Sequence, residues 1–212
     1  WWDANISKNE KEIGIMGQLD GVKIVDLSTY IAAPSCGRIL ASYGADVIKV
    51  ESPKGDDLRK AQVSYGYPAE TDEYSWGMDV QNANKKGLCL NLRTPEGIEA
   101  MYKLLETADV FLTNNRVQAL VKMGLDWDTL HAKFPRLIHA SILGYGENGP
   151  LKDKPGFDYT SQEEVSLTHL WRKVQHPQFP YQDSAMTMLV SLFHQVSAQL
   201  FTNRLRQARA RE

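Results

Sequence analysis

One acidic residue lies in a local sequence that could support chemistry. Asp158 lies within residues 155–159, where Gly156 allows a tight turn and Phe157 supplies an apolar neighbour. A desolvated carboxylate of this kind can act as a nucleophile or as an acid/base group. The same residue could instead cap a helix that begins near residue 159. The local sequence leaves both interpretations open.

A glycine-rich loop over residues 144–149 matches the G-x-G-x-x-G pattern of dinucleotide-binding proteins. That pattern needs a helix whose N-terminus receives the pyrophosphate, but Pro150 follows at once. It also belongs after the first strand of such a fold, whereas this loop follows the fifth. We therefore predict a loop at the carboxyl end of a strand, the edge at which open α/β sheets bind ligands.

The remaining motifs exclude several kinds of enzyme. The sequence contains no P-loop, no C-x-x-C pair and no G-x-S-x-G elbow, and we interpret His131 and His139 as structural. Basic side chains are by default solvated charges. Five of them would suit a polyphosphate if the fold brought them together: Lys85, Lys86, Arg93, Arg116 and Lys122.

Composition is that of an ordinary globular protein, with 42% hydrophobic and 24% charged residues among 212. A net charge of -2 argues against nucleic acid as a partner. Because there is no long apolar run and no secretory signal pattern, we expect no membrane span and a cytoplasmic location. Cys36 and Cys89 suit neither a metal site nor a disulfide framework, and no metal is predicted.

Alternating strand and helix patterns must position these residues. Strands are predicted at residues 22–27, 46–50, 88–92, 109–112 and 137–143. Helices are predicted at residues 35–43, 94–107, 117–122 and 127–134. Thr94 and Pro95 form a helix start signal, Gly124 is a stop signal, and residues 53–84 are predicted to be a long irregular excursion. This spacing indicates an α/β, Rossmann-like fold with a mainly parallel sheet.

Composition divides the chain into three parts. Residues 1–15 are interpreted as an extension, and residues 16–160 as the α/β domain. All 15 glycines lie at or before Gly156, so residues 161–212 form an atypical tail. A long helix over residues 184–209 would explain the lack of glycine, since glycine is unfavourable inside helices. The alternative is that truncation or a frameshift replaced the segment that originally followed.

Taken together, residues 17–160 resemble the family III CoA-transferases. The resemblance rests on five stretches in the order and spacing of the family: LDGVKIVDLSTYIAAPSCGRILASYGADVIKVESPKGDDLR, NANKKGLCLNLRTPEG, ADVFLTN, ALVKMGLDW and HASILGYGENGPLKDKPGFDYT. Within the family they are most similar to enzymes of anaerobic bacteria that move CoA between 2-hydroxy acids and their enoyl derivatives. The resemblance implies transfer of CoA from an acyl-CoA to a small carboxylic acid through a mixed anhydride on an enzyme carboxylate.

The resemblance also implies which residues bind coenzyme A. They lie at or after the ends of four of the predicted strands and include three basic side chains. They are Ile31, Ala32, Leu90, Asn91, Leu92, Arg93, Asn114, Asn115, Arg116, Lys122, Leu143, Gly144, Tyr145 and Gly146. Backbone amides and Arg or Lys side chains there would hold the adenine and the phosphates, so the glycine-rich loop would face the nucleotide of CoA.

The match to the catalytic residues of the family is incomplete. Asp158, the candidate catalytic residue, matches the acid/base aspartate of the racemase branch, whereas the transferase nucleophile lies in a later glycine-rich loop. Residues 161–165 should begin that loop but contain no glycine. Full-length family members are also longer and form homodimers of interlocked subunits. Three hypotheses follow: a CoA-transferase, an inactive truncated CoA-binding fragment, or α-methylacyl-CoA-racemase-type proton transfer by Asp158.

Overall fold

A computed structural model describes residues 17–59 and 75–153 of the chain. They fold around a sheet of five strands: β1 (Lys23–Leu27), β2 (Asp46–Glu51), β3 (Lys86–Cys89), β4 (Val110–Thr113) and β5 (Ile138–Ser141). The strands lie in the order β3-β2-β1-β4-β5, and every neighbouring pair is parallel. The predicted α/β, Rossmann-like fold is confirmed.

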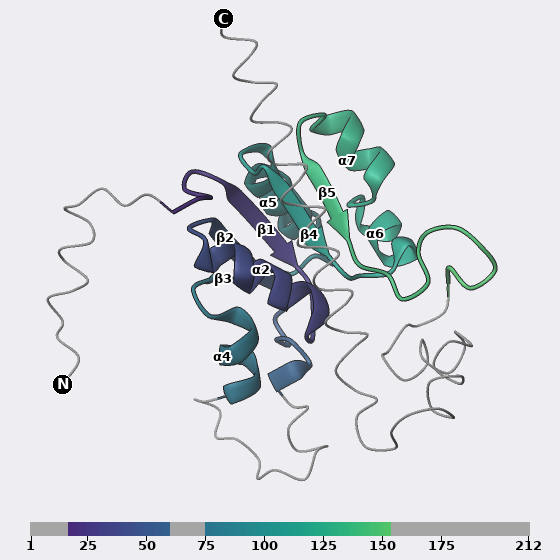
Figure 1. The fold of residues 1–212 in the computed structure, drawn as a ribbon. Coiled ribbons are helices and arrows are strands. Elements are labelled where there is room, and N and C mark those ends of the chain that lie inside the picture. The colour runs from purple at the N-terminus through teal and green to yellow at the C-terminus, as the bar shows by residue number, and fades with distance from the viewer. Residues whose placement is uncertain (1–16, 60–74, 154–212) are drawn as a thin grey trace, which may run out of the picture.

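Helices cover both faces of this sheet (Figure 1). One face carries α2 (Ala32–Ser42), and α4 (Trp76–Asn82) contacts α2. The other face carries α5 (Pro95–Glu106), α6 (Val117–Met123) and α7 (Trp127–Lys133). Within the described ranges, no helix is both long enough and apolar enough to cross a membrane.

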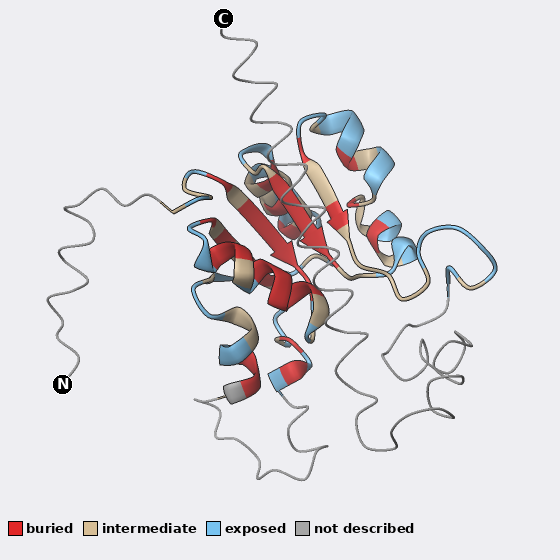
Figure 2. Cartoon of the chain, in the orientation of Figure 1, coloured by how far each residue is buried: buried red, intermediate tan, exposed pale blue. Residues whose placement is uncertain are grey.

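Strand residues point alternately into two hydrophobic cores, as the two-residue period of a strand requires. Ile24 packs with Leu40 of α2 in one core, whereas its neighbour Val25 packs with Met101 of α5 in the other. Figure 2 shows the buried residues concentrated along β1, β4 and α2. Continuous burial of this kind is typical of the central strands of a parallel sheet covered on both faces.

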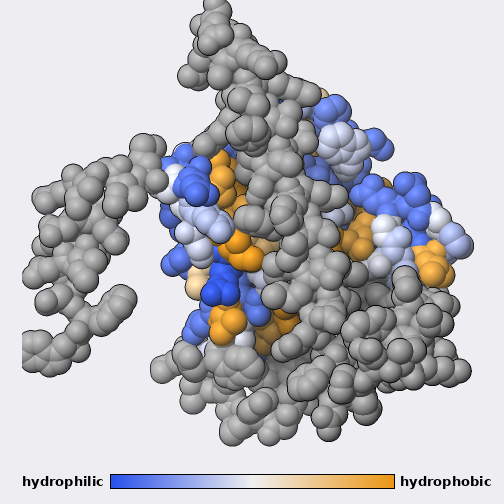
Figure 3. Space-filling view, in the orientation of Figure 1, coloured by the Kyte–Doolittle hydropathy of each residue, from blue (hydrophilic) through white to orange (hydrophobic). Residues whose placement is uncertain are grey.

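The surface keeps some large apolar side chains. Val121 is 56% exposed and Trp127 46% exposed, and Ile31 at the start of α2 is 41% exposed. Figure 3 shows the hydrophobic side chains of the visible described face in small patches, interrupted by hydrophilic ones. Single apolar residues at the surface are ordinary in soluble domains.

The predicted start and stop signals of the later helices are confirmed. The Thr94 side chain caps α5 by accepting a hydrogen bond from a first-turn amide, and Pro95 is the first helical residue. Helix α6 ends at Gly124, which has a left-handed backbone with φ of 67°. Asp126 then caps α7 in the same way as Thr94 caps α5. These contacts are local, so the sequence predicts them well.

The third strand differs from its prediction. It comprises Lys86–Cys89 and not residues 88–92, because Lys86 already pairs with Ile48 of β2. Beyond Leu90, the chain leaves the sheet through a turn in which the Thr94 amide donates to the Asn91 carbonyl. The apolar pattern of residues 88–92 therefore continues beyond Cys89, where the pairing with β2 ends.

Two helices also differ from their predictions. Helix α4 lies within the segment predicted to be irregular, and Ser75 caps it by accepting a hydrogen bond from the Met78 amide. The glycine and proline residues of the same segment favour turns, so the sequence did not reveal Ser75 as a helix start. Helix α2 begins three residues earlier than predicted, because Pro34 fits a first turn, where no amide hydrogen bond is needed.

Several predictions lie outside the described residues. They concern the extension over residues 1–15, the tail over residues 161–212 with its helix at 184–209, and Asp158.

Candidate functional site

The connections that follow β1 and β4 run over opposite faces of the sheet. From β1 the chain crosses to β2 through α2 on one face, whereas from β4 it crosses to β5 through α6 and α7 on the other (Figure 1). The loops after β1 and β4 therefore diverge at the carboxyl edge of the sheet. In open α/β sheets, this switch point is where ligands bind.

Side-chain amides tie these two loops together. Asn114 accepts a hydrogen bond from the Thr29 amide at 2.9 Å and donates one to the Thr29 carbonyl at 2.8 Å. Asn115 donates to the Leu27 carbonyl at 2.9 Å. Both asparagine side chains are thus engaged within the protein, and they fix the shape of the loop after β1.

The predicted CoA-binding residues lie mostly along this one edge. Ile31 and Ala32 begin α2, and the other groups, 90–93, 114–116 and 143–146, follow β3, β4 and β5. Residues 114 and 115 contact the loop after β1 that leads into the first group, through Thr29 and Leu27. The loops after β3 and β5 are four strand spacings apart, or roughly 19 Å. An elongated ligand could contact both loops, whereas a compact one could not.

The glycine-rich loop after β5 opens no helix within the described residues, which end at residue 153. Gly146 and Gly149 have φ of 74° and 103°, a conformation that favours glycine. The hydroxyl of Tyr145 is buried, and it has no hydrogen-bond partner in the part of the chain described. The backbone therefore agrees with a ligand-facing turn and not with a dinucleotide fingerprint.

Three of the five basic residues that could bind a polyphosphate are exposed in the described part of the chain. Arg93, Arg116 and Lys122 are exposed, and none of them forms an ion pair within the described ranges. Arg93 follows β3 and Arg116 follows β4, both at the carboxyl edge, whereas Lys122 lies in the last turn of α6.

The other two basic residues do not join them. Lys86 lies at the start of β3 and pairs at 2.7 Å with Asp46, which starts β2, so it belongs to the amino edge of the sheet. Lys85 is buried and pairs with Asp26 of β1. The five cations therefore do not converge. Lys86 lies at the opposite edge of the sheet, and the Lys85 side chain is buried in an ion pair and is not available to a ligand at the surface.

Two buried ion pairs lie on the α2 face beneath the carboxyl edge. Lys85 donates to Asp26 at 2.7 Å, and these side chains are 1% and 0% exposed. Lys85 also donates to the Pro34 carbonyl and the Asn82 side chain, so all three ammonium hydrogens are used. In the second pair, Lys49 donates to Asp56 at 2.9 Å.

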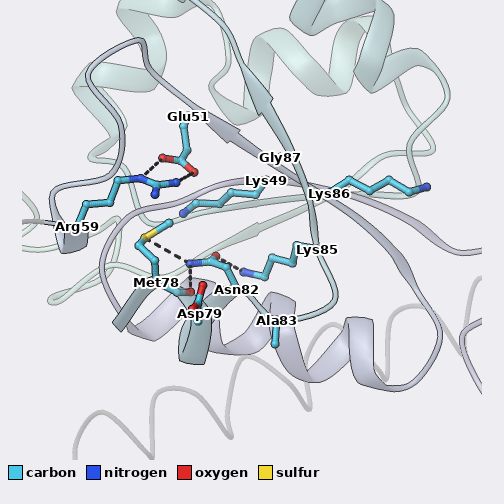
Figure 4. A pocket seen from close by; sticks show the side chains of 10 residues that line it. All are labelled: Lys49, Glu51, Arg59, Met78, Asp79, Asn82, Ala83, Lys85, Lys86 and Gly87. Atoms are coloured by element: carbon cyan, nitrogen blue, oxygen red, sulfur yellow. Dashed lines mark hydrogen bonds and ion pairs between the residues drawn. The ribbon is translucent and has the colours of Figure 1, made fainter. Parts of the chain in front are cut away.

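Figure 4 shows both lysines at the wall of a pocket of about 380 Å³ beside α4. Glu51 and Arg59 lie at its rim, joined by two hydrogen bonds of 3.1 and 2.9 Å. Burial lowers the pKa of Lys85, while the adjacent Asp26 carboxylate opposes that shift. Each of the four cations in the pocket wall, Lys49, Arg59, Lys85 and Lys86, thus already forms an ion pair with an acidic side chain.

Comparison with known proteins decides the family. A model of the family described as CoA-transferase family III matches residues 19–204. The chain belongs to CoA-transferase family III. The resemblance drawn from the motifs is thereby confirmed.

Relatives of this family III chain include two transferases from clostridia. It is 52% identical over 143 residues to the (R)-2-hydroxy-4-methylpentanoate CoA-transferase of Clostridioides difficile, covering 68% of this chain and 36% of that protein. It is 51% identical to the cinnamoyl-CoA:phenyllactate CoA-transferase of Clostridium sporogenes, covering 66% and 34%. The chain therefore spans about a third of the length of these relatives.

Two solved structures share the fold. A CAIB/BAIF family protein from Brucella suis matches with a TM-score of 0.76 and 31% identity, covering 91% of this chain and 51% of that one. A hypothetical protein from Mycobacterium tuberculosis matches with a TM-score of 0.75 and 30% identity, covering 89% and 51%.

Motif analysis missed the two buried ion pairs of this family III chain. The available signal was the strand period itself. Asp26 stands two residues after Ile24, and Lys49 two residues after Val47, so each charge occupies a core-facing position. A charge in such a position needs a buried partner, because desolvating it alone is costly.

The two cysteines are expected to react at very different rates in the folded chain. Burial raises the pKa of Cys36 to about 12, and the nearby Asp26 carboxylate adds to this effect. At pH 8, only about one such thiol in 10⁴ is ionised. Cys89 is exposed on β3. Titration with a thiol-reactive chromophore should give one fast equivalent, and peptide mapping should locate it at Cys89. A second fast equivalent before denaturant is added would contradict this prediction.

Proposed function

We propose that this chain forms the CoA-binding part of an enzyme that transfers CoA between an acyl-CoA and a small carboxylic acid. The observation that carries the proposal is a set of exposed cations that form no ion pair within the described residues: Arg93 and Arg116 at the carboxyl edge, and Lys122 on α6. Free Arg and Lys side chains are suited to phosphate groups. The start of α2, which has no side-chain cap among the described residues, adds backbone amides of the kind that bind phosphates.

The inferred reaction is nucleophilic catalysis by a carboxylate. The carboxylate attacks the acyl carbon of the thioester, the C–S bond breaks, and a mixed anhydride and a CoA thiolate result. The acceptor acid then exchanges for the donor acid, and the thiolate takes up the new acyl group. The described residues would hold CoA in place between these steps, so that thiolate and anhydride stay close together. The nucleophile of the family belongs to the later glycine-rich loop that residues 161–165 do not match, and Asp158 is the candidate acid/base residue of the racemase alternative.

The names of the two clostridial relatives indicate the substrate class. Both relatives share about half of their aligned residues with this chain. We therefore propose 2-hydroxy acids and their CoA thioesters as the acids exchanged. A homodimer of the full-length protein and a cytoplasmic location are further parts of the proposal.

Charge removal at the carboxyl edge should weaken CoA binding. Arg93→Gln and Arg116→Gln are each expected to raise the dissociation constant for CoA about 3–10-fold, measured by isothermal titration calorimetry. Lys103→Gln is the control, because Lys103 is an exposed lysine of α5 that pairs with Glu99 within the helix. Affinity should also fall as salt is added. Absence of CoA binding by the unaltered chain, or an equal loss in the control, would contradict the proposal.

The chemical step is tested by adding an acyl-CoA and then hydroxylamine. An enzyme hydroxamate, located by mass spectrometry, would identify the carboxylate that forms the anhydride. Incorporation of deuterium from the solvent at the α-carbon, abolished by Asp158→Ala, would instead indicate racemase-type chemistry. CoA binding without either product would identify the chain as a binding part only.

A further inference from the structure

Side chains from two neighbouring strands and their loops hold the backbone of the loop after β1, residues 28–31. The Lys49 ammonium donates to the Ser28 carbonyl. Asn114 engages both the amide and the carbonyl of Thr29, and Asp56 accepts a hydrogen bond from the Tyr30 amide at 3.2 Å. Four consecutive backbone groups of this loop are therefore satisfied by side chains, and none of the four relies on a sheet partner.

The loop needs such support because its backbone is unfavourable. Tyr30 has φ of 63°, in the left-handed region that residues with a Cβ rarely adopt. The residue that follows is Ile31, which precedes the first turn of α2. The conformation of Tyr30 thus decides where α2 begins relative to the switch point.

Asp56 is itself rigidly placed. It pairs with Lys49 at 2.9 Å, and the two side chains are 0% and 3% exposed. Its carboxylate also accepts a hydrogen bond from the Leu58 amide at 3.0 Å. The Asp56 amide donates to Glu51, which Arg59 holds through two hydrogen bonds (Figure 4). The carboxylate therefore has little freedom to follow the loop if the loop moves.

We propose that Lys49 and Asp56 are positioning residues for the CoA site, holding residues 28–31 in the conformation that places the start of α2 at the switch point. The proposal rests on the proposed function, because it takes Ile31 and Ala32 as part of the CoA site. Neither Lys49 nor Asp56 contacts the ligand in this account. Their effect on binding passes entirely through the backbone of the loop.

The decisive variant replaces the pair by apolar side chains of similar size, Lys49→Met with Asp56→Leu. Replacing both partners of a buried pair in this way often leaves stability unchanged, while here it removes two contacts to the loop. The matched control is Lys54→Met with Asp57→Leu, because both residues are exposed and lie in the same segment. If the double variant does not fold, Asp56→Ala, which removes the acceptor of the Tyr30 amide, is judged by the same criteria with Asp57→Ala as its control.

Two measurements are made on each chain: hydrogen exchange of residues 28–32 without ligand, and the dissociation constant for CoA. In the double variant, exchange of the Thr29 and Tyr30 amides should rise at least tenfold, with the β1 and β4 amides unchanged. The dissociation constant should rise at least tenfold, and both quantities should stay within twofold in the control.

Loop exchange equal to that of the control would overturn the positioning role, whether or not CoA binds. Faster exchange with unchanged CoA affinity would overturn the link to the site. Failure of the unaltered chain to bind CoA counts against the proposed function, and the exchange measurement then still decides whether Lys49 and Asp56 hold the loop.

Discussion

Replacing Lys85 by methionine is expected to lower the free energy of unfolding by about 3–5 kcal/mol. The substitution leaves the Asp26 carboxylate fully buried without its cation. The Ser28 hydroxyl still donates to Asp26, but one hydroxyl does not replace an ammonium group. Urea unfolding followed by circular dichroism measures the loss.

The neighbouring lysine provides the control. Lys86→Met should cost less than about 1 kcal/mol, because Lys86 and Asp46 are 70% and 43% exposed and water screens their attraction. Asp26→Asn combined with Lys85→Met should recover part of the loss, since no uncompensated charge then stays buried. Equal losses in the two lysine variants would show that burial of the pair does not control stability.

Gly97→Ala is expected to destabilise the chain by about 1–3 kcal/mol, although alanine is the better helix former. A Cβ at Gly97 would lie 2.0 Å from the carbonyl oxygen of Asn91, closer than any real contact. Because that obstacle is backbone, α5 or the loop after β3 must move. Asn91 lies in a predicted CoA-binding loop, so CoA affinity should fall as well.

Gly87→Ala is the matched glycine control. A Cβ at Gly87 meets no atom within 4 Å, so the change should alter stability by no more than about 0.5 kcal/mol. Thermal unfolding and CoA titration of both variants test the pair. If Gly97→Ala proved as stable as the unaltered chain, the close approach of α5 to Asn91 would be wrong.

Elements whose signals are local could be predicted from the sequence. Thr94 and Pro95 start α5, and Gly124 ends α6, because capping depends on residues within one turn of the helix. The alternation of strands and helices likewise predicted a parallel sheet, since each strand needs a crossover before the next. Helix α4 was missed because its cap, Ser75, lies among turn formers.

The candidate site was only partly predictable. Motif resemblance selected the loops that follow β1, β3, β4 and β5, and strand direction brings those loops to one edge. It did not indicate that Asn114 is committed to Thr29, or that Lys85 is buried against Asp26. Those partners lie 85 and 59 residues apart in the chain, and nothing in either local stretch specifies the other.

The sequence by itself therefore determined the family and the order of most helices and strands, and it predicted the edge of the sheet at which we propose that the ligand binds. The tertiary structure decided which charged side chains are exposed and which form buried ion pairs. Arg93 and Lys85 are both basic residues in the same stretch of sequence, but Arg93 lies exposed after β3 and the Lys85 side chain is buried beneath α2. The physical reason is that desolvation depends on which strands become neighbours, and the order β3-β2-β1-β4-β5 is a property of the whole chain.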